Sequence, residues 1–131
     1  NAVGPGKRML SAMSPSIVVG PSGQLRMVTG TPGGATIITT VFQTLSNVLD
    51  YGMNAVQAVN APRVHHQHLP DQLYFEPAGL EPSTVQRLRA MGHTLVERQD
   101  VSGDAQVILI GDDGALTAWS DPRRGGRAVG W

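Results

Sequence analysis

A pair of glycines stands where the chain changes from a β-rich run to a helical pattern. Gly33 and Gly34 close the string TGTPGG at residues 29–34, directly before the helix-patterned residues 35–51. A glycine pair at a helix N-terminus leaves backbone N–H groups exposed, with the positive end of the helix dipole behind them. Such donors suit a phosphate, a carboxylate or the oxyanion of an acyl transfer. The same pair is also common in the loop that precedes a helix, so both interpretations stay open at this point.

Three histidines form a second group that could do chemistry. They lie in the string RVHHQH at residues 63–68. In an extended segment His66 and His68 share one face, and imidazole is a common ligand of zinc and nickel. The chain has no cysteine, and no arrangement of Ser, His and Asp is favoured by spacing alone. The sequence therefore offers a candidate oxyanion site and a candidate metal site, but no nucleophile of its own.

The composition is that of one ordinary globular domain without net charge. Of the 131 residues, 40% are hydrophobic, which can supply a sizeable core. Ten basic residues balance ten acidic ones, and no basic stripe or Lys/Arg-rich amphipathic helix favours nucleic acid or a membrane surface. No apolar run is long enough to span a membrane. We therefore expect neither a nucleic-acid partner nor a membrane span.

The glycine pair must be positioned by the elements on either side of it. Residues 16–19 and 25–29 are β-rich runs joined by the turn GPSG, which predicts a hairpin. Residues 35–51 have helical periodicity. Their apolar side chains are expected to share one stripe: Ile38, Val41, Phe42, Leu45, Val48 and Leu49.

The rest of the chain alternates short helices and strands. Asn54 to Gln57 has the pattern of a variant capping box that opens a short helix. A further helix is expected at 82–91, and strands at 73–75, 94–97, 107–110 and 116–119, with 107–110 as a buried run. Consecutive hairpins imply an antiparallel sheet with packed helices, the α+β class.

Four ordered strings give the chain a family resemblance. They are KRMLSAMSP (7–15), TGTPGG (29–34), APRVHHQ (61–67) and SDPR (120–123) with the closing VGW (129–131). Together they resemble the C-terminal part of the small subunit of γ-glutamyltranspeptidases (γ-glutamyltransferases), over essentially all 131 residues. Four strings in order are far more specific than any one of them.

The resemblance implies a fold and a missing nucleophile. The fold would be part of an N-terminal-nucleophile hydrolase αββα sandwich, with antiparallel sheets and packed helices. In that family a precursor cleaves itself, and the new N-terminal threonine of the small subunit is the nucleophile. We therefore expect residues 1–131 to be a single incomplete domain, a C-terminal fragment of the small (catalytic) subunit that is inactive alone. Exposed sheet edges would favour self-association of such a fragment.

The resemblance also implies partners and a reaction. The parent would transfer a γ-glutamyl group from glutathione or a related amide to water or an amino acid, through an acyl-threonine. Its expected partners are the large subunit, the missing N-terminal part of the small subunit and the small-molecule substrate. No metal or organic cofactor is expected. If the protein is bacterial, the expected location is the periplasm or the medium.

Site residues follow from matching positions. Gly33 and Gly34 match the family's oxyanion-hole glycines, and Ser11 and Ala12 match a Ser-Ser pair that helps to hold the substrate's α-carboxylate. Ala12 keeps its N–H and lacks a hydroxyl, which weakens this clamp by about 1 kcal/mol at most. The family's similar histidine loop has no metal in its mechanism, so a structural role is favoured for the histidines. Asp121 and Arg123 are expected to form a local ion pair or turn.

Two alternatives remain beside the γ-glutamyl reaction. The alanine at position 12 keeps open a glutaryl or cephalosporin acylase, or a poly-γ-glutamate depolymerase, on the same scaffold. The parent could also be a non-catalytic binding paralogue. Threonine at the self-cleavage site would support an enzyme.

Overall fold

The computed structural model describes residues 3–9, 11–99 and 102–130. Leu10 and Trp131, which belong to two of the strings above, lie outside the described residues. In chain order the elements, with η marking 3₁₀ turns, are β1 (Ser16–Val19), β2 (Leu25–Gly30), η1 (Gly34–Thr36), α1 (Ile37–Leu49), α2 (Ala55–Asn60), β3 (Val64–His65), β4 (Leu73–Phe75), α3 (Pro82–Ala90), β5 (Leu95–Glu97), β6 (Gln106–Ile110), β7 (Leu116–Ser120) and η2 (Pro122–Arg124).

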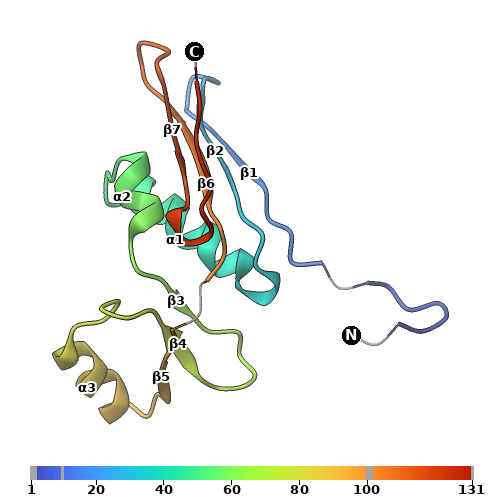
Figure 1. The fold of residues 1–131 in the computed structure, drawn as a ribbon, viewed down its shortest axis with the longest axis vertical. Helices are drawn as coiled ribbons and strands as arrows, with labels where there is room; N and C mark the ends of the chain where they lie inside the picture. Colours follow the sequence, from blue (N-terminus) through green and yellow to red (C-terminus); the bar gives the residue numbers. More distant parts are fainter. Residues whose placement is uncertain (1–2, 10, 100–101, 131) are drawn as a thin grey trace.

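Two sheets organise the chain, as Figure 1 shows. The larger one has the strand order β1-β2-β6-β7 and is antiparallel throughout, so both predicted hairpins are confirmed and lie side by side. The smaller one, β3-β4-β5, contains a parallel pair, because α3 connects β4 to β5 as a crossover. The α+β class is confirmed, and the parallel pair is the feature that the hairpin pattern did not predict.

Helices α1 and α2 cover one face of the larger sheet (Figure 1). The capping box predicted at the start of α2 is present, with Asn54 Oδ1 accepting from the Gln57 N–H at 2.9 Å. Between helices and sheet lies a core of small and medium side chains: Met27, Ala55, Val59, Ala105 and Val107. Every second strand residue points into this layer, which fixes the register of the sheet.

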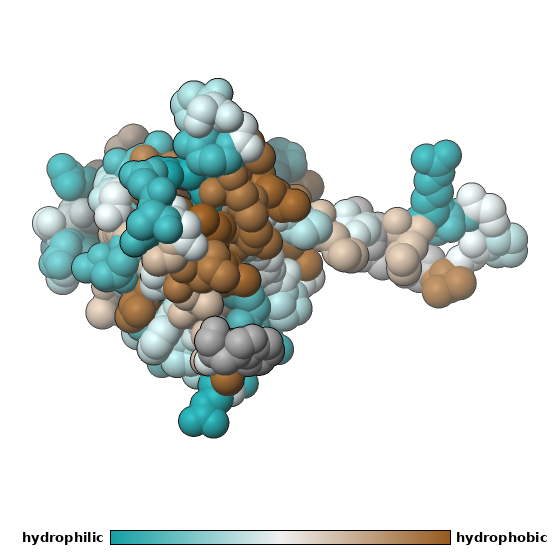
Figure 2. All heavy atoms as spheres, turned by 90° about the horizontal axis from the view of Figure 1, so that it is seen from above, coloured by the Kyte–Doolittle hydropathy of each residue, from teal (hydrophilic) through white to brown (hydrophobic). Residues whose placement is uncertain are grey.

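The opposite face of the larger sheet is apolar and open in this chain. Cross-strand pairing places Ile17, Val28, Ile108 and Ala118 in one row across four strands. The Ile17 residue is 69% exposed and Ile108 is 41% exposed. Figure 2 shows hydrophobic residues gathered on one side of the body. The expectation of a buried run at 107–110 was therefore wrong, because successive side chains alternate between the two faces and only Val107 of this run is buried.

Helix α1 packs with a face that overlaps only part of the predicted stripe, since Val41 is buried and Leu45 and Val48 pack against the core. Its buried residues are Ile37, Thr40, Val41 and Thr44. Of the predicted stripe, Ile38, Phe42 and Leu49 are 58%, 67% and 56% exposed. The packed face includes threonines, which periodicity counts as polar, and Thr44 can be buried because its hydroxyl donates to the Thr40 carbonyl at 2.8 Å.

Within the described residues, none of the helices combines the length and the apolarity that crossing a bilayer requires.

Candidate active site

The glycine turn leads from β2 into α1. Gly33 has φ 148° and ψ 8°, and Gly34 has φ 59°. Both backbones lie in regions that residues with a Cβ rarely adopt, which explains the glycine pair. The Gly33 carbonyl is tied into the helix start, because it accepts from the Thr36 N–H at 3.2 Å and from the Thr36 hydroxyl at 3.0 Å. Neither N–H of the pair donates to any other described residue.

The two glycines differ in their surroundings. A Cβ at Gly33 would lie 2.8 Å from Thr36 Oγ1 and 3.2 Å from Gly103 Cα, so this position has no room for a side chain. A Cβ at Gly34 would meet nothing within 4 Å. The turn is therefore packed on the side of the Gly33 Cβ position and open on the side of the Gly34 Cβ position.

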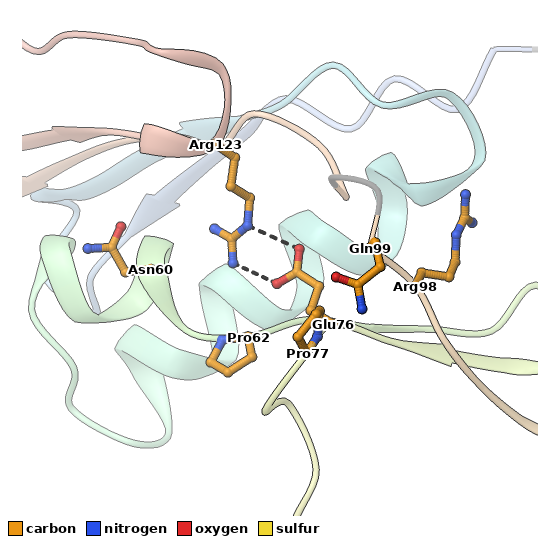
Figure 3. A pocket seen from close by; sticks show the side chains of 7 residues that line it. All are labelled: Asn60, Pro62, Glu76, Pro77, Arg98, Gln99 and Arg123. Atoms are coloured by element: carbon orange, nitrogen blue, oxygen red, sulfur yellow. Dashed lines mark hydrogen bonds and ion pairs between the residues drawn. The ribbon is translucent and has the colours of Figure 1, made fainter.

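A cluster of four charged side chains lies on the other side of the 102–105 segment. Arg63 Nη2 and Asp121 Oδ2 are 2.7 Å apart, and their side chains are 3% and 0% exposed. Asp121 also accepts from the Ala105 N–H at 3.0 Å and from the Arg123 N–H at 3.0 Å. The Arg123 guanidinium meets Glu76 with two parallel bonds of 3.0 and 2.7 Å, drawn in Figure 3.

The cluster draws four distant parts of the chain together. Arg63 and Arg123 both donate to the Val59 carbonyl at the end of α2, and Arg63 also donates to the Ser102 carbonyl. Two arginines face two carboxylates, so the buried charges balance. The local pair expected between Asp121 and Arg123 is present, but it is one part of a larger network that spacing did not reveal.

Burial and pairing set the protonation states in the cluster. Burial lowers the pKa of Arg63, although Asp121 opposes this. Burial alone would raise the pKa of Asp121, yet hydrogen bonds from the N–H groups of Ala105 and Arg123, together with Arg63, hold that pKa below its usual value. The pKa of Arg123 is raised despite burial, because Glu76 and Asp121 stabilise its charge. For Asp121 and Arg123 the shifts favour the charged form at neutral pH.

An open pocket of about 300 Å³ adjoins the cluster (Figure 3). Its lining residues are Asn60, Pro62, Glu76, Pro77, Arg98, Gln99 and Arg123. The carboxylate of Glu76 and the guanidinium of Arg123 are committed to each other, and no nucleophilic side chain lines the pocket. The pocket therefore has the character of a structural crevice beside the ion pairs.

The histidines have structural partners. His65 is 4% exposed, its Nδ1 lies 2.8 Å from Thr39 Oγ1, and its Nε2 lies 3.0 Å from Gln67 Oε1. The His66 Nε2 atom lies 3.0 Å from Asp71 Oδ1 at the surface. Among the described residues, no group of three or more His, Cys, Asp or Glu side chains could hold a metal. The hydrogen bonds of His65 and His66 tie the loop to neighbouring side chains, and the structural role of the histidines stays a prediction.

Ser11 and Ala12 lie on the extended N-terminal segment (Figure 1). This segment joins the sheet near the glycine turn, since a Cβ at Gly30 would lie 3.8 Å from Pro15 Cα. The Ser11 hydroxyl is exposed and accepts from the Met13 N–H at 3.4 Å. Among the described residues, no hydrogen bond joins Ser11 or Ala12 to the glycine pair, so the structure does not assemble the two halves of the expected site.

A sheet with helices on one face and an apolar opposite face is the arrangement of one half of an αββα sandwich, and similarity to solved γ-glutamyltranspeptidase structures places the chain in the N-terminal-nucleophile hydrolase class. The family model of γ-glutamyltranspeptidase matches residues 1–131, and the chain belongs to that family. In an αββα sandwich the apolar sheet face packs against a second sheet, which accounts for the exposed row on β1 and β6.

Relatives and a solved structure agree with this assignment. The chain is 52% identical over 123 residues to the glutathione hydrolase proenzyme of Escherichia coli, covering 94% of this chain and 21% of that protein. It is 48% identical over 132 residues to the corresponding proenzyme of Pseudomonas aeruginosa, covering 99% and 23%. The γ-glutamyltranspeptidase of Helicobacter pylori superposes with a TM-score of 0.84 at 43% identity, over 94% of this chain and 67% of that one. The chain thus spans about a fifth of the length of these curated relatives.

Proposed function

We propose that this chain is the C-terminal part of the small subunit of an enzyme that transfers γ-glutamyl groups from glutathione or related amides to water or amino acids. The observation that carries the proposal is the glycine turn. Gly33 and Gly34 offer two N–H groups at the start of α1 that have no partner among the described residues, and the Cβ position of Gly34 is open. Family membership supplies the acyl chemistry that such donors would serve.

In the proposed mechanism the nucleophile is a threonine that precedes this segment in the full-length protein. Its α-amino group takes the hydroxyl proton while Oγ bonds to the γ-carbonyl carbon. The carbonyl oxygen becomes an oxyanion and accepts from the N–H groups of Gly33 and Gly34. The amine then leaves with the proton, and water or an amino acid releases the γ-glutamyl group from threonine. Loss of one such donor typically costs about 3 kcal/mol of barrier lowering.

Substrate selection would involve the N-terminal segment. The exposed Ser11 hydroxyl and the N–H of Ala12 would hold the α-carboxylate of the γ-glutamyl group. We further propose that the large subunit and the preceding part of the small subunit complete this pocket, and that a bacterial parent acts in the periplasm or outside the cell.

The test uses the full-length protein, purified and analysed by intact mass and N-terminal sequencing. Two chains are expected, the smaller one beginning with threonine and containing this segment, together with release of anilide from a γ-glutamyl anilide. The isolated 131-residue chain is expected to release none. A single uncleaved full-length chain without turnover would contradict the proposal and favour a non-catalytic binding paralogue.

Ala12 favours a second candidate, an acylase or depolymerase on the same scaffold, because the family's second serine hydroxyl is missing from the clamp. Hydrolysis of γ-glutamyl and glutaryl anilides by the full-length protein separates the two, since only the first substrate carries an α-amino group. Preference for the glutaryl compound would replace the γ-glutamyl assignment.

A further inference from the structure

We propose that Thr31 and Gly103 are positioning residues that hold the Gly33–Gly34 turn in its donor geometry. This inference rests on the proposed function, because it assigns these two residues to the same oxyanion site. The contacts of both residues are with the neighbouring loop backbone, so their proposed role is to fix backbone rather than to touch substrate.

The sheet brings the two segments together. Gly30 at the end of β2 pairs with Gln106 at the start of β6. The strands are antiparallel, so the 31–34 turn and the 102–105 segment meet at the same end of the sheet. Two loops that leave neighbouring strand ends can brace each other through short contacts.

The Thr31 hydroxyl is the polar link between the two loops. Its Oγ1 accepts from the Asp104 N–H at 2.7 Å and donates to the Pro32 carbonyl at 2.6 Å. One hydroxyl therefore joins the 102–105 segment to the peptide that leads directly into Gly33. A methyl group in its place would leave the Asp104 N–H without this acceptor.

Gly103 contributes to the contact between the two loops by close packing. Its φ is 82°, and a Cβ on it would lie 2.8 Å from Thr31 Oγ1 and 3.2 Å from Thr40 Cγ2. A Cβ on Gly33 would in turn lie 3.2 Å from Gly103 Cα. The two glycine backbones thus pack face to face, and the space behind the turn admits no side chain on either one.

The charged cluster holds the 102–105 segment in place from the side away from the glycine turn. The Ser102 carbonyl accepts from Arg63, and the Ala105 N–H donates to Asp121 at 3.0 Å. Residues on both sides of Gly103 are therefore fixed to buried side chains. A fixed 102–105 segment gives the turn a rigid backing, and donor placement within a fraction of an ångström determines how well an oxyanion is stabilised.

The experiment compares Thr31→Val, Thr31→Ser and Gly103→Ala in the full-length enzyme, with Gly34→Ala as the marker of the oxyanion site. We measure kcat, normalised to the fraction of cleaved precursor, KM and the thermal midpoint. For Thr31→Val and Gly103→Ala we expect kcat to fall roughly 10- to 100-fold with KM little changed, because the donors act on the transition state. Thr31→Ser keeps the hydroxyl and should retain most of the wild-type kcat.

Three results would overturn the inference. First, Thr31→Val could retain the wild-type kcat while Gly34→Ala loses it. This result would refute the positioning role of Thr31 and leave the proposed oxyanion site intact. Second, Thr31→Ser could lose as much as Thr31→Val, so the hydroxyl would not be the cause. Third, the loss could lie wholly in KM, which indicates substrate binding. If the wild-type enzyme and all variants lack turnover, the proposed function fails and this inference fails with it. The test does not depend on correct folding of Gly103→Ala, because Thr31→Val keeps the size of the side chain.

Discussion

The glycine turn and the charged cluster both hold distant segments together, yet they do so by opposite means. The cluster uses side chains, and its carboxylates and guanidinium groups are engaged with one another or with backbone. The turn uses backbone, and it leaves the N–H groups of Gly33 and Gly34 without a partner among the described residues. Buried charges whose hydrogen bonds are all made indicate a structural role, whereas backbone donors without a partner indicate a candidate catalytic site.

The largest effect is expected when the cluster loses one charge. Asp121→Asn leaves Arg63 buried beside a neutral partner, which costs about 3–5 kcal/mol of unfolding free energy. Urea unfolding of the full-length protein measures this cost. Asp112→Asn is the matched control, because Asp112 pairs with Arg26 at the surface, its side chain is 88% exposed, and such pairs contribute about 1 kcal/mol or less. If both variants lost the same unfolding free energy, the buried cluster would contribute no more stability than a surface ion pair, which would contradict its structural role.

A substitution in the turn should separate activity from stability. Gly34→Ala places a methyl group in the open space beside the turn, where it would obstruct the substrate carbonyl in the proposed mechanism. We expect kcat to fall about 100-fold, while the unfolding free energy falls by only about 1–2 kcal/mol, the cost of a left-handed backbone with a Cβ. Steady-state kinetics and urea unfolding give the two quantities. An active Gly34→Ala enzyme would remove the turn from the mechanism.

The smallest effect is a pH dependence that only one region should show. The pKa of Asp121 is lower in the folded state than its ordinary value near 3.9. Its ionised form therefore stabilises the fold above about pH 4, and this contribution is lost as the pH falls through the folded-state pKa. The stability difference between wild type and Asp121→Asn should shrink from about pH 6 to about pH 3, whereas the difference for Gly34→Ala should stay constant. A constant difference for both would contradict the assigned charge state.

Local signals in the sequence predicted the hairpins, the capping box of α2 and the glycine turn, because each depends on residues a few positions apart. The Arg63–Asp121 pair joins residues 58 positions apart, and no local pattern predicts such a contact. The packed face of α1 was predicted only in part, since Val41, Leu45 and Val48 pack as expected but the buried threonines were not foreseen. Thr40 and Thr44 are buried there, and the Thr44 hydroxyl donates to the Thr40 carbonyl, which a hydrophobic stripe does not describe.

The candidate site was predicted only in part. The glycine turn itself was predicted, because glycines before a helical pattern are a local signal, whereas the oxyanion role of Gly33 and Gly34 came only from the family resemblance and stays a prediction. The string around Gly103 has the composition of an ordinary turn, and its contact with Gly33 exists only because β2 pairs with β6. Ser11 and Ala12 remain predictions, since no contact among the described residues joins them to the turn.

The central claim is that the N–H groups of Gly33 and Gly34 receive the oxyanion of acyl transfer. The most direct test is a crystal structure of the full-length, cleaved enzyme bound to a phosphonate analogue of the γ-glutamyl group. We predict that one phosphonate oxygen lies about 2.7–3.1 Å from both N atoms, the range expected for oxyanion donors. A phosphonate bound to threonine with its oxygens turned away from this turn would contradict the account.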